Sequence, residues 1–154
     1  MKMKKILYIL AAVCLLASCE KAKDNSPEPI AKDPIVGDWH CTSVAIDAEI
    51  YVTFKEDNTF VHYQQIGEGA YRVYNGTYNL EKQEGETVQI LTGSYNDGSS
   101  WGSSYELVMG ENSMTLSAAG ITETYDKLSD GIPSEVLASS VTVVKSEDEV
   151  IPFL

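Results

Sequence analysis

Short runs of alternating apolar and polar residues fill the chain from Gly37 to Leu128. In one run, Ile50, Val52 and Phe54 alternate with more polar residues, which is typical of a β-strand with one buried face. Turns rich in Gly, Asn and Asp separate the runs. We therefore expect eight strands, at residues 38–46, 49–55, 59–66, 70–81, 86–95, 101–109, 113–118 and 121–128.

The turns are short, so consecutive strands are expected to pair as antiparallel neighbours. No amphipathic helix lies between the strands to cover the apolar face of the sheet. Eight antiparallel strands are enough for the sheet to close on itself, which buries that face and removes the edges. The pattern predicts an all-β fold, an eight-stranded antiparallel up-and-down barrel over residues 35–129. Residues 130–154 are expected to form a short helix beginning near Pro133 and an acidic tail.

The chain begins with the three parts of a secretory leader. Three lysines precede an apolar stretch, residues 6–16, which is shorter than the roughly 20 residues that a membrane-spanning helix needs. Residues 16–19, Leu-Ala-Ser-Cys, resemble the lipobox of bacterial lipoproteins. This resemblance implies that residues 1–18 are a lipoprotein signal peptide and that Cys19 carries lipid. The alternative is an ordinary secretory signal that contains a cysteine.

Residues 19–34 contain three prolines and almost no apolar side chains, a composition that predicts a flexible tether. The charged start of this segment resembles the surface-export tethers of Bacteroidetes lipoproteins. Leader and tether together predict a protein of the cell envelope that is anchored to the outer membrane through Cys19. The protein would lie on the periplasmic or the surface-exposed face of the outer membrane. The membrane is therefore one expected partner, contacted through the lipid on Cys19.

Four motifs in the strand region resemble those of small lipocalin-like lipoproteins of the Bacteroidetes type. They are residues 37–39 (Gly-Asp-Trp), 54–60 (Phe-Lys-Glu-Asp-Asn-Thr-Phe), 75–78 (Asn-Gly-Thr-Tyr) and 94–102 (Ser-Tyr-Asn-Asp-Gly-Ser-Ser-Trp-Gly). The resemblance implies a lipocalin-like (calycin-like) barrel in which Gly37 and Trp39 close one end. Better-known lipocalins also have a Thr-Asp-Tyr-type loop motif, and an arginine near the last strand that packs on this tryptophan. Here the loop motif is missing and the last strand has Lys127 as its one cation.

The chain has 23 acidic and 11 basic residues, a formal net charge of −12. It therefore lacks the basic surface that nucleic-acid binding requires, and we expect no nucleic-acid partner. Cys-x-x-Cys, His-Glu-x-x-His and calcium-loop motifs are also missing from the sequence. We expect no metal and no cofactor.

The sequence shows no catalytic constellation. His40 and Cys41 are neighbours on a predicted strand, so their side chains point to opposite faces and cannot form a dyad. No serine lies in a nucleophile-elbow pattern. We expect no enzymatic activity, with a hydrolase whose site goes unrecognised as an alternative. Cys41 is expected to be a buried apolar thiol, with a reactive thiol as the alternative.

Inward-facing residues of the predicted barrel are the candidates for ligand binding. His62 shares a strand face with Phe60, a core residue by its pattern, so His62 is expected to point inward. Arg72 shares a face with Tyr74, which would place it inward near the rim. The alternative, which we favour slightly for Arg72 alone, is that a bulge shifts the register and turns Arg72 toward solvent or onto an aromatic ring. The aromatic candidates for the binding site are Tyr74, Trp101 and Tyr105.

Two functions follow from these candidates. The first is a lipid-anchored barrel that binds a small amphipathic or apolar ligand, with Arg72 and His62 receiving its polar or anionic head group. The alternative is a surface module for protein interaction, an inhibitor or an accessory subunit, with a filled barrel. Small residues such as Gly76 and Gly93 would leave room for a cavity if they face inward. Trp101 is then either an exposed platform in its loop or a cover over the barrel mouth.

Overall fold

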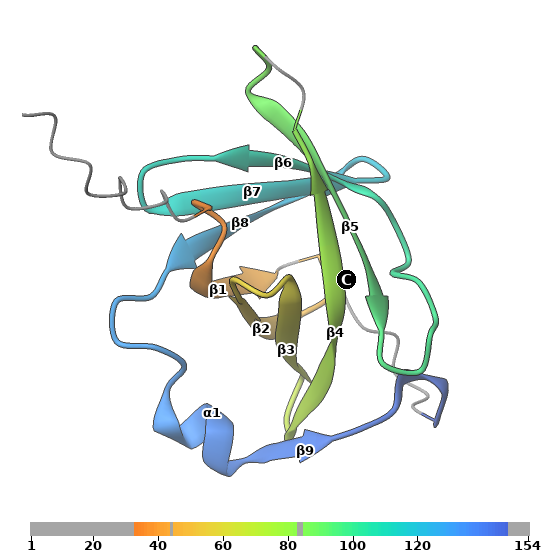
Figure 1. Cartoon of the computed structure of the whole chain (residues 1–154). Helices are drawn as coiled ribbons and strands as arrows, with labels where there is room; N and C mark the ends of the chain where they lie inside the picture. The colour runs from red at the N-terminus through yellow and green to blue at the C-terminus, as the bar shows by residue number, and fades with distance from the viewer. Residues whose placement is uncertain (1–32, 44, 83–84, 148–154) are drawn as a thin grey trace, which may run out of the picture. The chain divides into compact units, whose positions relative to one another are not determined.

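A computed structural model of the chain describes residues 33–43, 45–82 and 85–147, which lie in the unit Ala31–Leu154. Cys19, the predicted signal peptide and almost all of the predicted tether lie outside the described residues. Figure 1 shows a fold built almost entirely of strands. The elements are β1 (Gly37–Ser43), β2 (Ala48–Phe54), β3 (Thr59–Ile66), β4 (Tyr71–Glu81), β5 (Val88–Tyr95), β6 (Tyr105–Met109), β7 (Ser113–Ala118), β8 (Ile121–Lys127), α1 (Ser134–Ala138), β9 (Ser140–Thr142) and η1 (Lys145–Glu147).

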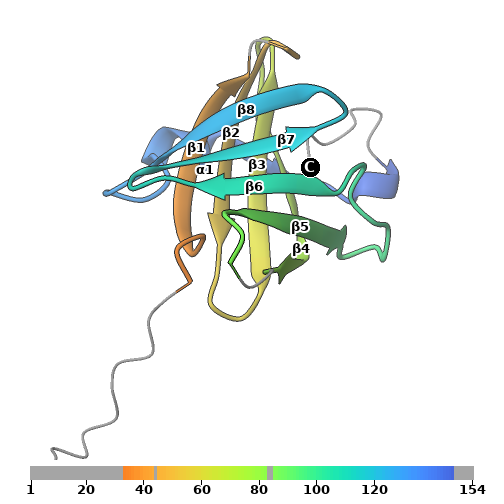
Figure 2. The same ribbon diagram turned by 90° about the horizontal axis from the view of Figure 1, so that it is seen from above.

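Strands β1 to β8 form a closed antiparallel barrel. Each strand pairs with the next along the chain, from β1 with β2 through to β7 with β8. Pairing of Trp39 with Lys127 joins β1 to β8 and closes the ring. The predicted eight-stranded up-and-down barrel is therefore confirmed. In Figure 2, β6, β7 and β8 cross in front of β1 to β4, so the two halves of the barrel run at a steep angle to each other.

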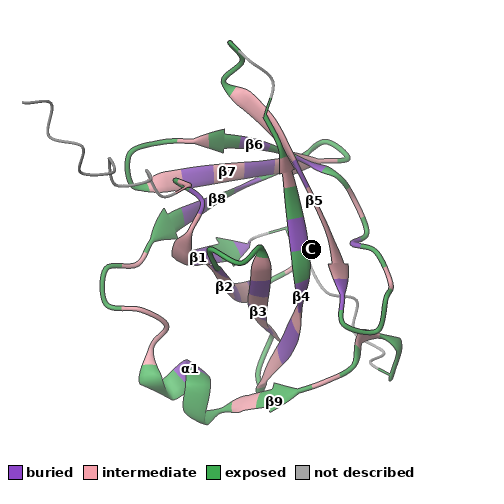
Figure 3. Ribbon diagram, viewed as in Figure 1, coloured by how far each residue is buried: buried purple, intermediate pink, exposed green. Residues whose placement is uncertain are grey.

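The alternation of apolar and polar residues in the sequence corresponds to side chains that point alternately into the barrel and out of it. Along β2, Ile50, Val52 and Phe54 are buried while the residues between them are partly exposed. Figure 3 shows buried segments on all sides of the barrel wall. Among the described residues, no helix is long and apolar enough to cross a membrane.

Strand β4 belongs to both halves of the barrel and turns from one to the other at Gly76. Its first half pairs with β3 and its second half with β5, and the two pairings overlap at Gly76 and Thr77. A Cβ atom on Gly76 would lie 1.9 Å from the carbonyl oxygen of Ser94. Glycine is therefore required here, because the β5 backbone takes up the space of a side chain.

Trp39 lies at one end of the barrel, which we call the closed end. Its side chain is 1% exposed, and its indole N–H donates a hydrogen bond of 2.8 Å to the carbonyl oxygen of Ile35. The ammonium of Lys127 lies 5.0 Å from the centre of the indole ring. Lys127 thus makes the cation contact that an arginine makes in better-known lipocalins. Gly37 has a φ of 142°, which favours glycine where the chain enters the barrel beside Lys127.

After the barrel, the chain returns along its outside. The short helix expected near Pro133 begins at Ser134, and Val136 within it is buried. Strand β9 follows and pairs in parallel with the start of β4, with Ser140 opposite Tyr71. This pairing was not expected from the sequence. It is available because β5 ends opposite Gly76, which leaves that edge of β4 without a β5 partner.

Candidate functional site

Buried polar residues gather at the end of the barrel opposite Trp39, which we call the mouth. Ser43 at the end of β1, Gln64 near the end of β3 and Glu123 near the start of β8 all lie there. Their exposed fractions are between 1% and 7%. His62, one inward position deeper than Gln64, is fully buried. The closed end has no such set among its buried described residues, so the two ends differ in chemistry.

The carboxylate of Glu123 has two partners on β1. The Ser43 hydroxyl donates a hydrogen bond of 2.6 Å to Oε1, and the Cys41 thiol lies 3.8 Å from Oε2. Burial and the charge of Glu123 raise the pKa of Cys41 to about 12. The Cys41 thiol is buried, as expected, although its surroundings are not wholly apolar because the Glu123 carboxylate lies beside it.

His40 lies on the outer surface, as its adjacency to Cys41 predicted. Its Nε2 is 2.6 Å from the Glu49 carboxylate, and its ring stacks on Tyr51 with centroids 4.4 Å apart. Cys41 lies on the opposite face of the same strand and is buried. The two side chains do not form a dyad. Among the described residues, no three His, Cys, Asp or Glu side chains are grouped so as to hold a metal ion.

His62 is the most unusual of the predicted site residues. It points inward, as expected, and neither of its ring nitrogens has a hydrogen-bond partner among the described residues. Burial lowers the pKa of the imidazole to about 3, so the ring is neutral at physiological pH. The nearest ring contact is with Tyr74, at 6.0 Å between centroids. A neutral imidazole has one donor and one acceptor, and leaving each unpaired costs about 1–3 kcal/mol.

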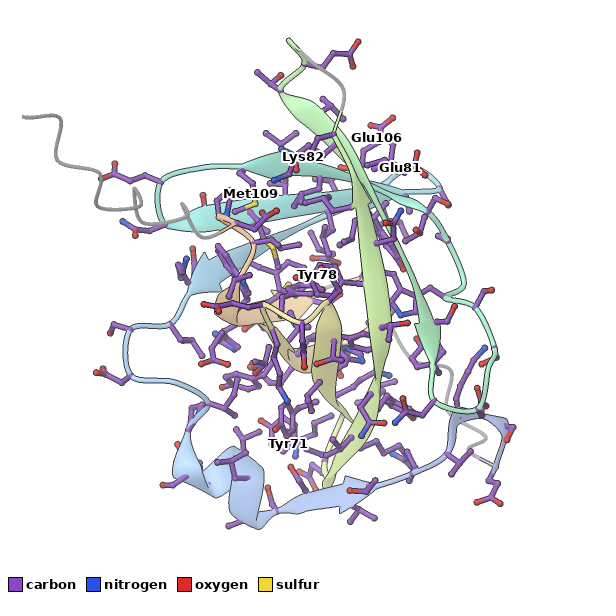
Figure 4. The ribbon with its side chains drawn as sticks, viewed as in Figure 1. Tyr71, Tyr78, Glu81, Lys82, Glu106 and Met109 are labelled. Carbon is purple, nitrogen blue, oxygen red and sulfur yellow. The ribbon has the colours of Figure 1, made fainter. Side chains whose placement is uncertain are left out.

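A connected set of aromatic rings runs from His62 across the barrel interior. Tyr74 contacts Tyr95, Tyr95 contacts Phe60, and Phe60 contacts Trp101, with ring centroids 5.1–6.1 Å apart. Trp101 in turn contacts Tyr105 at 6.1 Å. In Figure 4, Tyr78 likewise lies among the side chains inside the barrel. The predicted candidates Tyr74, Trp101 and Tyr105 are therefore brought together as interior packing residues.

Trp101 is 6% exposed, so the alternative of an exposed platform is wrong. Its ring takes the space above Gly93, where a Cβ atom would lie 2.3 Å from the indole. Gly93 and Gly76 thus do not leave a cavity, because each admits a neighbouring group instead. Inward packing of Trp101 also explains why β6 begins at Tyr105 and not at residue 101. The indole N–H of Trp101 is buried and has no partner among the described residues.

Arg72 lies at the mouth. Along β4, Arg72 lies on the same strand face as Tyr74, Gly76 and Tyr78, which are buried. No bulge interrupts the register between β3 and β4. The Arg72 side chain is half-buried and lines a pocket of about 580 Å³. Of the two orientations weighed above, the inward one near the rim is the one observed. The other residues of this pocket are Glu68, Gly69, Ala70, Val141, Thr142, Val143, Val144 and Glu147.

A second pocket of about 280 Å³ lies on the other side of the same C-terminal segment. It is lined by Tyr74 and Tyr95 of the aromatic set and shares Thr142, Val143 and Val144 with the first pocket. Residues 142–144, which follow α1 in the chain, therefore separate the two pockets. A signal for this segment is present in the sequence, because residues 141–144, Val-Thr-Val-Val, have high β-propensity.

The model of a family described as a lipocalin-like domain matches residues 35–116, more than half of the chain. The matched span includes His62, Arg72 and the aromatic set, and it stops before β8 and the C-terminal segment. No curated protein matches significantly. No solved structure matches significantly.

Proposed function

Because the chain belongs to the lipocalin-like domain family, we propose that it is a binding protein whose barrel receives a small amphipathic or apolar ligand at the mouth. A barrel of eight strands is wide enough to hold one small molecule. Ligand binding is the role that the chemistry at the mouth favours.

The observation that carries this proposal is the buried imidazole of His62, which has no hydrogen-bond partner among the described residues. Buried polar groups in native proteins are nearly always paired, and an unpaired one calls for an explanation. A ligand that accepts a hydrogen bond from the His62 imidazole, or donates one to it, would explain the unpaired ring. Arg72 at the rim would then receive an anionic head group, and Tyr74, Trp101 and Tyr105 would pack on the apolar body.

One observation favours a second candidate function. The ring contacts from Tyr74 to Trp101 fill much of the barrel interior with aromatic side chains. A barrel that stays filled would act through its surface, as an inhibitor or an accessory subunit of a protein partner. The two candidates differ in whether a small molecule displaces rings near the mouth.

Native mass spectrometry of the mature protein, isolated from its own envelope, separates them. We expect a bound molecule that adds mass to the wild-type protein and is lost from His62→Leu and Arg72→Gln. Lys55→Gln is the matched control, because Lys55 is an exposed cation at the closed end. A wild-type protein without added mass, which also binds no anilinonaphthalene sulfonate in solution, would favour the surface module.

The site of action proposed here is the cell envelope. The lipobox-like residues 16–19 support removal of residues 1–18 and lipid attachment at Cys19, which would place the barrel on a tether at the outer membrane. Cys19→Ala is expected to move the protein from the membrane fraction to the soluble fraction. Retention of the variant in the membrane fraction, without a processed lipoprotein form of the wild type, would contradict the anchor.

A further inference from the structure

Residues 140–147, which we call the C-terminal strap, cover the side of the barrel at the mouth. Their strand β9 takes the edge of β4 that β5 leaves without a partner, and Val143 donates one more backbone hydrogen bond of 3.2 Å to Val73. Figure 1 shows the strap passing below β4 toward the end of β5. The strap therefore occupies the position of a ninth barrel strand, beside the part of β4 that β5 does not reach.

Among the described residues, a backbone hydrogen bond and a contact between a cation and an aromatic ring join the far half of the strap to the barrel. The backbone N–H of Ser146 donates a hydrogen bond of 3.0 Å to the Asp97 carboxylate, in the turn after β5. The Lys145 ammonium lies 5.3 Å from the centre of the Tyr95 ring. Val141 and Val144 of the strap are 52% and 45% exposed. Segments with few buried apolar contacts and exposed hydrogen bonds are those that open locally at low free-energy cost.

Tyr74 and Tyr95 lie directly under the strap. Both rings line the smaller pocket together with Val143, and both are nearly fully buried. His62 is the next ring beyond Tyr74. Displacement of the strap would join the two pockets that share Thr142, Val143 and Val144, and would leave Tyr74 as the last side chain before His62.

We propose that ligand enters the barrel laterally, between β4 and the end of β5, beneath a C-terminal strap that opens and closes, and that an uncharged hydrogen-bonding group of the ligand faces His62. This proposal rests on the proposed binding function and adds the route and the ligand class. The aromatic walls at Tyr74 and Tyr95 fit a flat apolar body. A neutral imidazole pairs with a hydroxyl, carbonyl or amide, and the burial that keeps it neutral offers no charge to a carboxylate.

A reversible cross-link tests the strap without requiring the natural ligand. In the double variant Asp97→Cys and Ser146→Cys, a disulfide would hold the strap closed, and reduction would release it. The Asp97 carboxylate already contacts Ser146, so the two positions are adjacent. Comparing the oxidised and reduced forms of one variant cancels the loss of the contacts between Asp97 and Ser99.

The readout is acylation of His62 by diethyl pyrocarbonate, followed by mass spectrometry at neutral pH. His40 is the internal reference, because it lies on the outer surface and is partly exposed. We expect His62 to react at least about tenfold faster in the reduced than in the oxidised form, with His40 unchanged. Equal His62 rates in the two forms would overturn the strap as the gate.

A second arm uses anilinonaphthalene sulfonate, an aromatic amphipathic probe, and measures its association rate by fluorescence. Faster association with the reduced form supports lateral entry beneath the strap. Association at the same rate in both forms overturns lateral entry while leaving the binding function intact. If the probe binds neither form, the wild-type protein carries no added mass and His62 labelling still depends on the disulfide, the binding function fails and the gate stands.

Discussion

The two ends of the barrel use similar side chains to opposite effect. At the closed end Trp39 is buried and its indole N–H is bonded to the carbonyl of Ile35. Near the mouth, Trp101 is also buried, yet its indole N–H has no partner among the described residues, and the same holds for both nitrogens of His62. The buried tryptophan at the closed end is therefore paired, whereas Trp101 and His62 keep buried polar atoms without a partner among the described residues. Such unpaired atoms cost stability, and a fully buried imidazole of this kind is the pattern expected where a protein binds a ligand.

The largest effect is expected from removing the tryptophan at the closed end. Trp39→Ala should lower the free energy of unfolding by about 3–5 kcal/mol, because it leaves a cavity and frees the Ile35 carbonyl. Urea denaturation measures this loss in the free energy of unfolding. Trp39→Phe and Trp101→Phe then form a matched pair, since only the first loses a hydrogen bond. An equal loss in both would show that the two ends do not differ in this way.

The next effect is a dependence of stability on pH that comes from His62. Its pKa is about 3 in the folded protein and 6.5 in its reference state, so the unfolded chain binds more protons between these values. Stability should therefore fall as pH falls from about 6.5, by about 1.4 kcal/mol per pH unit from this residue. Denaturation at pH 7, 6 and 5 of wild type and His62→Leu isolates the contribution as the difference. Identical slopes would mean that His62 finds a partner when protonated.

A smaller loss is expected from unpairing Glu123. Ser43→Ala removes the hydroxyl that donates to this buried carboxylate and should cost about 1–3 kcal/mol. The adjacent Thr42→Ala is the matched control, because Thr42 is exposed and its hydroxyl bonds to Glu49 on the outer surface. Equal effects of the two substitutions would indicate that water replaces the Ser43 hydroxyl at the mouth.

The smallest effect is expected for the cation at the closed end. Lys127→Ala should cost about 0.5–1 kcal/mol through loss of the contact with the Trp39 ring, measured as a shift in the urea midpoint. Lys127→Arg should preserve most of the stability, as the arginine of better-known lipocalins suggests. If Lys127→Ala changes stability no more than Lys55→Ala, the cation contact contributes nothing.

Much of the barrel could be predicted from the sequence because each strand has its own alternation and its own turn. The inward position of His62 followed from its parity with Phe60, and the structure has it. For Arg72 the sequence slightly favoured the orientation away from the interior, whereas Arg72 pairs with the buried Gln64 without a bulge. The inward turn of Trp101 and the pairing of β9 with β4 could not be predicted. They depend on a contact across the barrel with Gly93 and on where β5 ends, and neither is a local property of the sequence.

The most direct test of the contrast between the two ends is the stability of His62→Leu at pH 7, measured on protein freed of any bound molecule. Leucine fills a similar volume and has no polar atoms to leave unpaired. We predict that His62→Leu is more stable than wild type, by about 1–3 kcal/mol in the free energy of unfolding. A variant that is less stable than wild type would show that the imidazole is satisfied in the ligand-free protein and would contradict a ligand-binding mouth.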